Sequence, residues 1–598
     1  MSTYSAPIDD MQFVVKELIG LEQISSLPGC EEATPDLVDA LLEEAGKFAT
    51  GVLDPLNWPG DQHGATLSDG VVTAAPGFPK AYGQFCEAGW GALANDPEFG
   101  GQGLPHVVSA LTSEMWNAAC MSFALCPMLT SGAVHAIKRH GSHEQQAMYL
   151  PKLVSGKWAG TMNLTEPQAG SDLSAVRTRA VPQGDHYLIH GTKIFITWGE
   201  HNMAENIVHL VLARTPDAPE GVKGISLFIV PKFLVNADGS LGERNDVKCV
   251  SIEHKLGIHG SPTCVMAYGD ADGAIGYLVG EENRGLHQMF TMMNFARLEV
   301  GIEGVAIADR AYQRAVEFSK QRVQGREAGA KKGDRVTIIQ HPDVKRMLMS
   351  MKAHTEAMRA IAVQASAYLD VALHHPDAAE RARNQNLFDL LTPVVKGWCT
   401  EQSIQIASLG VQIHGGMGFV EETGAAQYLR DARITTLYEG TTGIQANDLM
   451  GRKIAYERGA TARALIDEMR SLDSELAKVA GHSVLATIRR SFGDAVASLS
   501  TSVDWMVDTY PHNIKAASAG AVPLLNLFGV VSGGWLMARA ALIAKQCIDD
   551  NVKNYDFYSA KLATARFYCE HILPLAQVYK AQIVSGADSV LTLEEMQF

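Results

Sequence analysis

TMNLTEPQAGSD, residues 161–172, divides the sequence into two kinds of predicted secondary structure. Before it the residues favour helices, with an amphipathic run that opens at Pro35. After it, short β-branched runs alternate with turns rich in Pro, Asn, Asp and Gly, which is typical of a small barrel or sandwich. The stretch itself combines Pro and Gly with hydroxyl side chains, so its N–H and O–H groups are available for a polar ligand. The expected strands are 186–197, 207–213, 225–230 and 249–253.

From about residue 286 the sequence turns helical again. Apolar residues between Val344 and Leu369 alternate steps of three and four, which predicts a long helix of an antiparallel bundle with Pro342 in its first turn. The charged, Gly-rich segment 320–335 is expected to form an exposed loop between two bundle helices. Nearer the N-terminus, a helix is expected from Val107, and Pro127 is expected to end it.

Together these elements predict an α+β multidomain fold in which a β-barrel domain separates helical domains. We expect an N-terminal helical domain at 1–160, a middle β domain at 161–285, a four-helix bundle at 286–455 and an additional helical domain at 456–598.

Composition limits the class of protein. Apolar residues make up 46% and charged residues 19%, as in an ordinary globular protein, and the net charge of −16 argues against nucleic-acid binding. The most apolar stretch, 521–544, is interrupted by Pro523 and Arg539, so we expect a buried helix or helix pair and no membrane span. Nine scattered cysteines without a C-x-x-C pair fit reduced thiols and no metal site. Neither end of the sequence carries a secretory or peroxisomal signal, so we expect a cytoplasmic enzyme.

Three further motifs accompany the first one. F-I-T-W-G at 195–199 ends an expected strand in a Gly turn, and Q-I-H-G-G-M-G-F at 412–419 contains three glycines that allow a ligand close to the backbone. The segment D-A-R-I-T-T-L-Y-E-G-T-T-G-I-Q at 431–445 places Glu439 after apolar residues and a tyrosine. Burial there would raise the pKa of Glu439 and make it a stronger base.

In this order, L-T-E-P-x-x-G-S-D, F-I-T-x-G, Q-I-H-G-G-x-G-F and L-Y-E-G-T-T-x-I-Q resemble the motifs of the acyl-CoA dehydrogenase superfamily, over about residues 40–455. The additional C-terminal helices and the opening A-P-I-D-D-M-Q-F resemble its large bacterial branch of about 600 residues, and within that branch the 3-methylmercaptopropionyl-CoA dehydrogenases. The resemblance implies non-covalent FAD as cofactor and an acyl-CoA thioester as substrate. It further implies electron-transfer flavoprotein as the electron acceptor and a homodimer.

The resemblance also assigns roles to single residues. Implied FAD-binding residues are Met162, Leu164, Thr165, Gly170, Ser171, Phe195, Thr197, Arg322, Gln412, Gly415, Gly416 and Thr441. Implied substrate-binding residues are Ser171, Asn294, Arg297, Tyr438 and Gly440. In relatives, the residues at the positions of Gln412, Gly415 and Gly416 usually contact FAD of a neighbouring subunit. Segment 322–326 departs from the family pattern, because it lacks an aromatic residue and brings Arg322 one residue closer to Gly, so the role of Arg322 stays open.

Glu439 is the implied catalytic base. It would remove the α proton of the acyl-CoA while the β hydride passes to flavin N5, giving a trans-2-enoyl-CoA. Some relatives place the base on the preceding helix, at the position of Ala296, and alanine cannot act as a base. The expected substrate is 3-methylmercaptopropionyl-CoA or another short- or medium-chain acyl-CoA.

Three alternatives stay open. An acyl-CoA oxidase would use the same base and flavin but react with oxygen. A DNA-associated alkylation-response flavoprotein of the same fold would need a basic surface in the last helical domain, yet residues 456–598 mix acidic and basic side chains. A desulfinase-like relative typically lacks the glutamate, so Glu439 argues against it.

Overall fold

The computed structural model describes residues 3–479 and 481–598 of the chain and separates into two compact units. Unit 2 contains residues 44–299, and unit 1 combines residues 1–43 with residues 300–598. The boundary at 299 falls inside helix α8 (Gly285–Gln321). The first 43 residues therefore belong to the same compact unit as the C-terminal helices.

Unit 2 begins with helices. Its longest is α6 (His106–His140), which is buried along most of its length. The other helical elements are the end of α3 (Pro35–Phe48), η2 (Ala49–Leu53), α4 (Asp54–His63), α5 (Phe78–Glu87), η3 (Trp90–Ala92), η4 (Pro97–Phe99), α7 (His143–Val154), η5 (Leu173–Ala175) and η6 (Gly221–Gly224).

The prediction that Pro127 ends its helix was wrong. Helix α6 continues to His140, and its interruption lies earlier, at Cys120, where φ is −158° and ψ is 86°. A proline removes one helical hydrogen bond and crowds the carbonyl four residues before it, which can kink a helix without ending it. The neighbours Leu125 and Leu129 are almost completely buried, so tertiary packing holds the segment helical on both sides of the proline.

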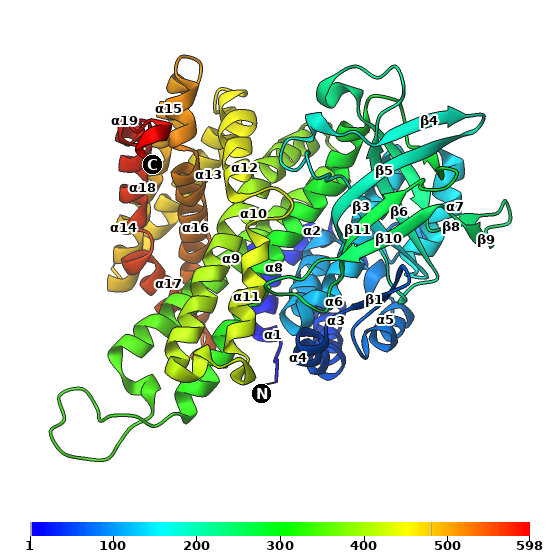
Figure 1. Cartoon of the computed structure of the whole chain (residues 1–598). Helices are drawn as coiled ribbons and strands as arrows, with labels where there is room; N and C mark the ends of the chain where they lie inside the picture. The colour runs from blue at the N-terminus through cyan, green and yellow to red at the C-terminus, as the bar shows by residue number, and fades with distance from the viewer. Residues whose placement is uncertain (1–2, 480) are drawn as a thin grey trace. The chain divides into compact units, whose positions relative to one another are not determined.

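Most of the β structure of unit 2 is one curled eight-stranded sheet (Figure 1). Its strand order is β10-β11-β5-β12-β7-β6-β3, with β4 paired to β5; all pairs are antiparallel except β3–β6. The curl brings β3 to the end of β5, where Thr161 Oγ1 donates to the carbonyl of Thr197 at 2.7 Å. The strands are β3 (Trp158–Asn163), β4 (Arg179–Gln183), β5 (His186–Thr197), β6 (Asn206–Ala213), β7 (Ser226–Pro231), β10 (Val247–Ile252), β11 (Thr263–Tyr268) and β12 (Ala274–Leu278). Two separate hairpins pair β1 (Thr66–Ser68) with β2 (Val71–Thr73) and β8 (Phe233–Val235) with β9 (Leu241–Arg244).

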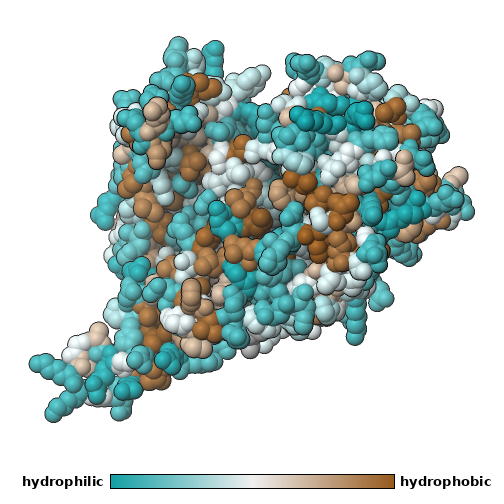
Figure 2. Space-filling view, in the orientation of Figure 1, coloured by the Kyte–Doolittle hydropathy of each residue, from teal (hydrophilic) through white to brown (hydrophobic). Residues whose placement is uncertain are grey.

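Unit 1 is helical. Helix α9 (Pro342–His374) begins at Pro342, as the sequence predicts, and α10 (Ala378–His414) is the helix that follows it. Residues 321–335 are all exposed, and Figure 2 shows the long loop at the lower left as hydrophilic. The remaining elements up to residue 455 are α1 (Ile8–Gln12), η1 (Phe13–Ile19), α2 (Leu21–Ser25), η7 (Ile338–Gln340), η8 (Gly415–Phe419), η9 (Glu421–Thr423), α11 (Ala425–Thr435), α12 (Thr442–Asn447) and η10 (Asp448–Ala455).

In the last block of unit 1, the sequence alone allowed either one helix or a helix pair over the apolar stretch 521–544. The stretch lies in one buried helix, α16 (Ala521–Asp549). Pro523 lies in its first turn, where no helical hydrogen bond is lost. Helices α6 and α16 are long and apolar enough to cross a membrane, but 89% and 83% of their most apolar windows are buried, so they are weak evidence for a span. The other elements are α13 (Ala460–Lys478), α14 (Ser483–Thr509), α15 (Ile514–Ala519), α17 (Tyr555–His571), α18 (Leu575–Ser585), α19 (Ala587–Val590) and η11 (Glu595–Gln597).

A buried charge cluster attaches the N-terminal segment to these helices. Asp10 of α1 pairs with Arg359 of α9 and with Lys561 of α17. Lys561 also contacts Glu356 at 3.0 Å, and Arg359 contacts Asp309 of α8 at 3.3 Å. One carboxylate near the N-terminus thus joins helices that lie several hundred residues apart in sequence.

Candidate active site

A buried ion pair shapes the loop that follows β3. Glu166 is 4% exposed, and its carboxylate accepts hydrogen bonds from Lys193 Nζ at 2.8 Å and from Thr178 Oγ1 at 2.6 Å. Lys193 also donates to the carbonyl of Leu164 at 2.9 Å. Burial alone would raise the pKa of Glu166, but the Lys193 ammonium and the hydrogen bonds lower it to about 2. The buried side of the loop is therefore held by Lys193, while Gly170 and Ser171 are exposed.

The end of β5 lies against this loop. The N–H of Ile194 donates to the carbonyl of Thr165 at 2.9 Å, next to the Thr161–Thr197 bond. Phe195 has a φ of 60°, a left-handed conformation that costs a non-glycine residue on the order of 1 kcal/mol. The residue is nevertheless 59% exposed. Strained backbone beneath an exposed aromatic ring is typical of a ligand site.

These residues fit a flat aromatic cofactor with a phosphate-bearing tail. Phe195 offers an exposed ring, and Thr165 and Thr197 are half-buried beside it. A Cβ added at Gly170 would meet nothing within 4 Å, so the backbone there is open to a ligand. Met162 is 8% exposed inside β3, which leaves mainly its backbone for contact.

Two of the predicted substrate residues in unit 2, Asn294 and Arg297, lie one turn apart on α8. Arg297 is buried, and its Nη1 donates to Asn294 Oδ1 at 3.3 Å. The guanidinium also lies 5.9 Å from the centre of the Phe290 ring. Arg297 thus contacts two residues of its own helix, and its role towards a substrate stays a prediction.

In unit 1, Glu439 lies on the turn between α11 and α12, with a left-handed φ of 53°. Its carbonyl accepts from Gln445 Nε2 at 3.1 Å, and the carbonyl of Gly440 accepts from the buried Lys396 Nζ at 2.6 Å. Thr441 caps α12 by accepting from the N–H of Ile444 at 3.3 Å. The turn is held through its backbone in a strained conformation, and Glu439 is half-buried.

Tyr438 turns its hydroxyl to a carboxylate. The hydroxyl donates to Glu303 Oε2 of α8, and burial together with Glu303 raises the pKa of Tyr438 well above its usual range. This hydrogen bond fixes the residue before Glu439 to another helix of the same unit.

The other predicted cofactor residues lie elsewhere in unit 1. Gln412 follows Lys396 by sixteen residues on α10, which is about 24 Å along the helix axis. Gly415 and Gly416 are exposed just beyond it, and a Cβ at either would meet nothing within 4 Å. Arg322 is exposed at the start of the long loop. Within one chain, Gln412 is therefore not brought to the turn of Glu439, and Gly415 and Gly416 of η8 follow it closely in sequence.

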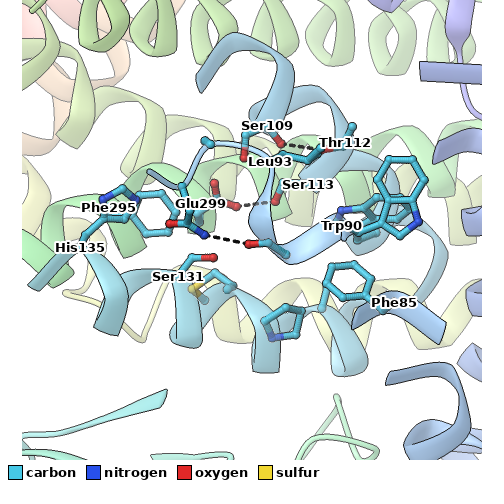
Figure 3. Close-up of a pocket in the computed structure, with 17 residues that line it drawn as sticks. Phe85, Trp90, Leu93, Ser109, Thr112, Ser113, Ser131, His135, Phe295 and Glu299 are labelled. Atoms are coloured by element: carbon cyan, nitrogen blue, oxygen red, sulfur yellow. Dashed lines mark hydrogen bonds between the residues drawn. The ribbon is translucent and has the colours of Figure 1, made fainter. Parts of the chain in front are cut away.

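The structure also reveals polar residues that the sequence did not identify. They include Lys193, Lys396 and the buried Glu299, which lines a cavity of about 50 Å³ in unit 2 (Figure 3). A charged residue at an inward strand or helix position is the local signal that each of them offers. The partner that makes each one useful is distant in sequence.

Four family models match the chain in order. The acyl-CoA dehydrogenase N-terminal, middle and C-terminal domains match residues 41–157, 161–271 and 283–454, and an acetyl-CoA dehydrogenase C-terminal-like domain matches 464–594. The chain belongs to the acyl-CoA dehydrogenase family, a family of FAD-binding oxidoreductases.

Among its relatives, the 3-methylmercaptopropionyl-CoA dehydrogenase of Ruegeria pomeroyi is 49% identical over 99% of both chains. A butyryl-CoA dehydrogenase of Syntrophomonas wolfei is 35% identical, also over 99% of both chains. The solved structure of a Bacillus anthracis acyl-CoA dehydrogenase complexed with FAD is 22% identical and covers 98% of this chain and 93% of its own, with a TM-score of 0.74. This last likeness shows the shared fold.

Proposed function

We propose that the chain dehydrogenates a short acyl-CoA to its trans-2-enoyl-CoA, with Glu439 as the base that removes the α proton. The turn that carries Glu439 is the main support, because two side chains hold its backbone while it presents a carboxylate in the family motif. The similarity to a 3-methylmercaptopropionyl-CoA dehydrogenase supports 3-methylmercaptopropionyl-CoA as the substrate.

Each set of residues contributes a separate part of the chemistry. Glu439 accepts the α proton, and its backbone N–H polarises the thioester carbonyl, which makes that proton more acidic. Thr165, Phe195, Thr197 and the open backbone at Gly170 would hold FAD, together with Thr441. Bound FAD would supply the acceptor for the β hydride. Asn294 and Arg297 would orient the CoA chain.

The oligomer and the partner belong to the same proposal. Gln412, Gly415 and Gly416 are exposed and distant from the Glu439 turn along α10, which supports their contacting FAD of a second copy in a homodimer. Electron-transfer flavoprotein would reoxidise the flavin, and the enzyme would work in the cytoplasm.

An anaerobic panel of acyl-CoAs tests the reaction and its base. Bleaching of the flavin band is followed for the wild type, for Glu439→Gln and for Glu422→Gln, which alters an exposed carboxylate in η9. We expect one short acyl-CoA to bleach the wild type and Glu422→Gln at equal rates. The rate for Glu439→Gln should fall about a thousandfold or more while FAD stays bound, because a general base contributes roughly 10² to 10⁴. Bleaching of Glu439→Gln at the wild-type rate would exclude this base, and a wild type that no acyl-CoA reduces would exclude the function.

A further inference from the structure

A lysine is buried in the middle of helix α10. Every residue from Leu390 to Thr400 is buried, and Lys396 is 0% exposed. Taking an ammonium group out of water costs free energy that an apolar side chain would avoid. A lysine between residues such as Val395 and Trp398, which are also fully buried, therefore calls for a role that an apolar residue could not fill.

The ammonium of Lys396 reaches the turn between α11 and α12, and helices α10 and α12 pack against each other within unit 1 (Figure 1). Lys396 Nζ donates to the carbonyl of Gly440 at 2.6 Å, one residue after the proposed base. A hydrogen bond from a charged donor is roughly twice as strong as one between neutral groups. Lys396 therefore fixes the direction of the peptide group between Gly440 and Thr441.

A second buried side chain, Gln445 of α12, holds the same turn. Its Nε2 donates to the carbonyl of Glu439 at 3.1 Å and lies 3.5 Å from the carbonyl oxygen of Gly440, so both carbonyls turn towards one nitrogen. Gln445 is 0% exposed. A Cβ added at Gly440 would lie 2.7 Å from this nitrogen, so the turn fits closely against the amide. Both carbonyl groups therefore face the buried side of the turn.

The direction of the two carbonyls decides what the turn presents on its other side. In a trans peptide, the N–H points opposite to the C=O of the same peptide group. The N–H groups of Gly440 and Thr441 therefore point away from the two buried donors. Glu439 has a left-handed φ of 53°, which a residue with a side chain adopts rarely and keeps only where its surroundings hold it. The contacts from α10 and α12 provide that hold.

We propose that Lys396 is a positioning residue for the transfer of the α proton. Through the carbonyl of Gly440 it holds Glu439 in its left-handed conformation, so that the carboxylate and the N–H groups of the turn meet a bound acyl-CoA in a fixed arrangement. The proposal rests on the proposed function. A shift of about 1 Å between reacting groups can cost on the order of a hundredfold in rate, so losing this hold should affect the rate more than binding.

The test separates the rate of flavin reduction from the binding of the ligands. Anaerobic stopped-flow with the acyl-CoA that bleaches the wild type fastest gives a limiting rate of reduction and a substrate dissociation constant for each FAD-loaded protein. The dissociation constant of FAD is measured separately. Lys396→Met keeps an unbranched side chain without a donor, and Gln445→Leu removes the second hold. Thr400→Val is the matched control, because Thr400 is buried one turn further along α10 and donates only to carbonyls of its own helix.

We expect Lys396→Met to lower the limiting rate about a hundredfold and Gln445→Leu about tenfold, because the first change removes a charged donor and the second a neutral one. The dissociation constants of substrate and FAD should stay within about threefold of the wild type, which is the pattern of an interaction that acts on the transition state. Thr400→Val should match the wild type in all three measurements.

Two results would overturn the inference. The first is a wild-type rate in Lys396→Met. The second is a loss of FAD or substrate affinity that accounts for the whole effect, because Lys396 would then only support the fold. If Lys396→Met does not fold, a wild-type rate in a folded Gln445→Leu overturns it instead.

The same experiment keeps this inference apart from the proposed function. If the wild type and Lys396→Met are reduced at equal rates while Glu439→Gln is slow, the inference fails and the proposed function stands. A wild type that no acyl-CoA of the panel reduces overturns both.

Discussion

Two buried glutamates of unit 2 show how differently one fold treats the same side chain. Glu166, in the loop after β3, is 4% exposed, and Glu299, beside the cavity, is 5% exposed. The pKa of Glu166 is lowered to about 2, whereas burial raises the pKa of Glu299 to about 7. Nearly equal burial therefore accompanies opposite shifts.

The partner decides the direction of the shift. Glu166 faces the ammonium of Lys193 and accepts four hydrogen bonds besides, so its charged form is favoured against the cost of burial. Glu299 faces the hydroxyl of Ser113, which offsets only part of that cost. The first glutamate is a permanent anchor for a loop, and the second can change its protonation near neutral pH.

Removing Lys193 should have the largest effect and should make Glu166 resemble Glu299. Lys193→Met leaves a buried carboxylate without its cation, which typically costs about 3 to 5 kcal/mol of unfolding free energy. The pKa of Glu166 should then rise above its usual range, and the loop that we assign to FAD should loosen. Denaturant unfolding of the holoenzyme and the dissociation constant of FAD measure the two consequences.

A double variant separates the lost ion pair from lost packing. Glu166→Gln combined with Lys193→Met removes both charges, so it should recover a large part of the stability lost in Lys193→Met alone. The exposed Lys157→Met serves as a control and should unfold like the wild type. A double variant less stable than Lys193→Met would show that the pair is not the source of the effect.

The comparison also predicts how stability depends on pH. The folded pKa of Glu299, about 7, lies above its ordinary value of 4.5, so between these values the folded state binds the proton more tightly than the unfolded state. Stability from Glu299 is therefore greatest below pH 4.5 and falls as the pH rises to about 7, by on the order of 3 kcal/mol. Unfolding free energies at pH 5 and pH 8 measure this fall.

Glu299→Gln is the matched control, because an amide of the same size does not titrate. The fall in stability between pH 5 and pH 8 should be smaller in this variant by nearly the full amount. His135, which also lines the cavity, has its pKa lowered to about 4 by burial and stays neutral over this range. An identical pH dependence in both proteins would mean that Glu299 is ionised in the folded state at pH 5.

Local patterns in the sequence predicted much of the fold. The strand expected at 186–197 has the same bounds as β5, and α9 begins at the predicted Pro342, because β-branched runs, turn residues and a helix-starting proline act over a few neighbours. The end expected at Pro127 failed because tertiary packing of α6 outweighs the local preference of one residue. The family followed from four motifs, and the roles of Glu439 and of the FAD residues stay predictions.

The pairs that tune the site could not be predicted in the same way. Glu166 belongs to the motif at 161–172, but its partner Lys193 comes 27 residues later. The two meet only because β5 packs against the loop in the folded protein. Ser113 and Glu299 are 186 residues apart and meet only when α6 and α8 pack together. A sequence pattern identifies a carboxylate, whereas its pKa depends on a partner that tertiary structure selects.

Removing the Ser113 hydroxyl should give the smallest effect. It tests most directly whether the partner of a buried carboxyl group sets its pKa. The hydrogen bond from Ser113 lowers the pKa of Glu299 against the effect of burial, so Ser113→Ala should raise that pKa further above 7. A lost bond to a carboxyl group is worth about 1 kcal/mol, which corresponds to a rise of somewhat under one unit. The pH at which the fall in unfolding free energy levels off should therefore move upwards, while Ser109→Ala, whose hydroxyl lines the cavity without bonding to Glu299, should leave it in place. A downward shift in Ser113→Ala would show that the serine stabilises the neutral acid, and would contradict the view that it opposes the effect of burial on this pKa.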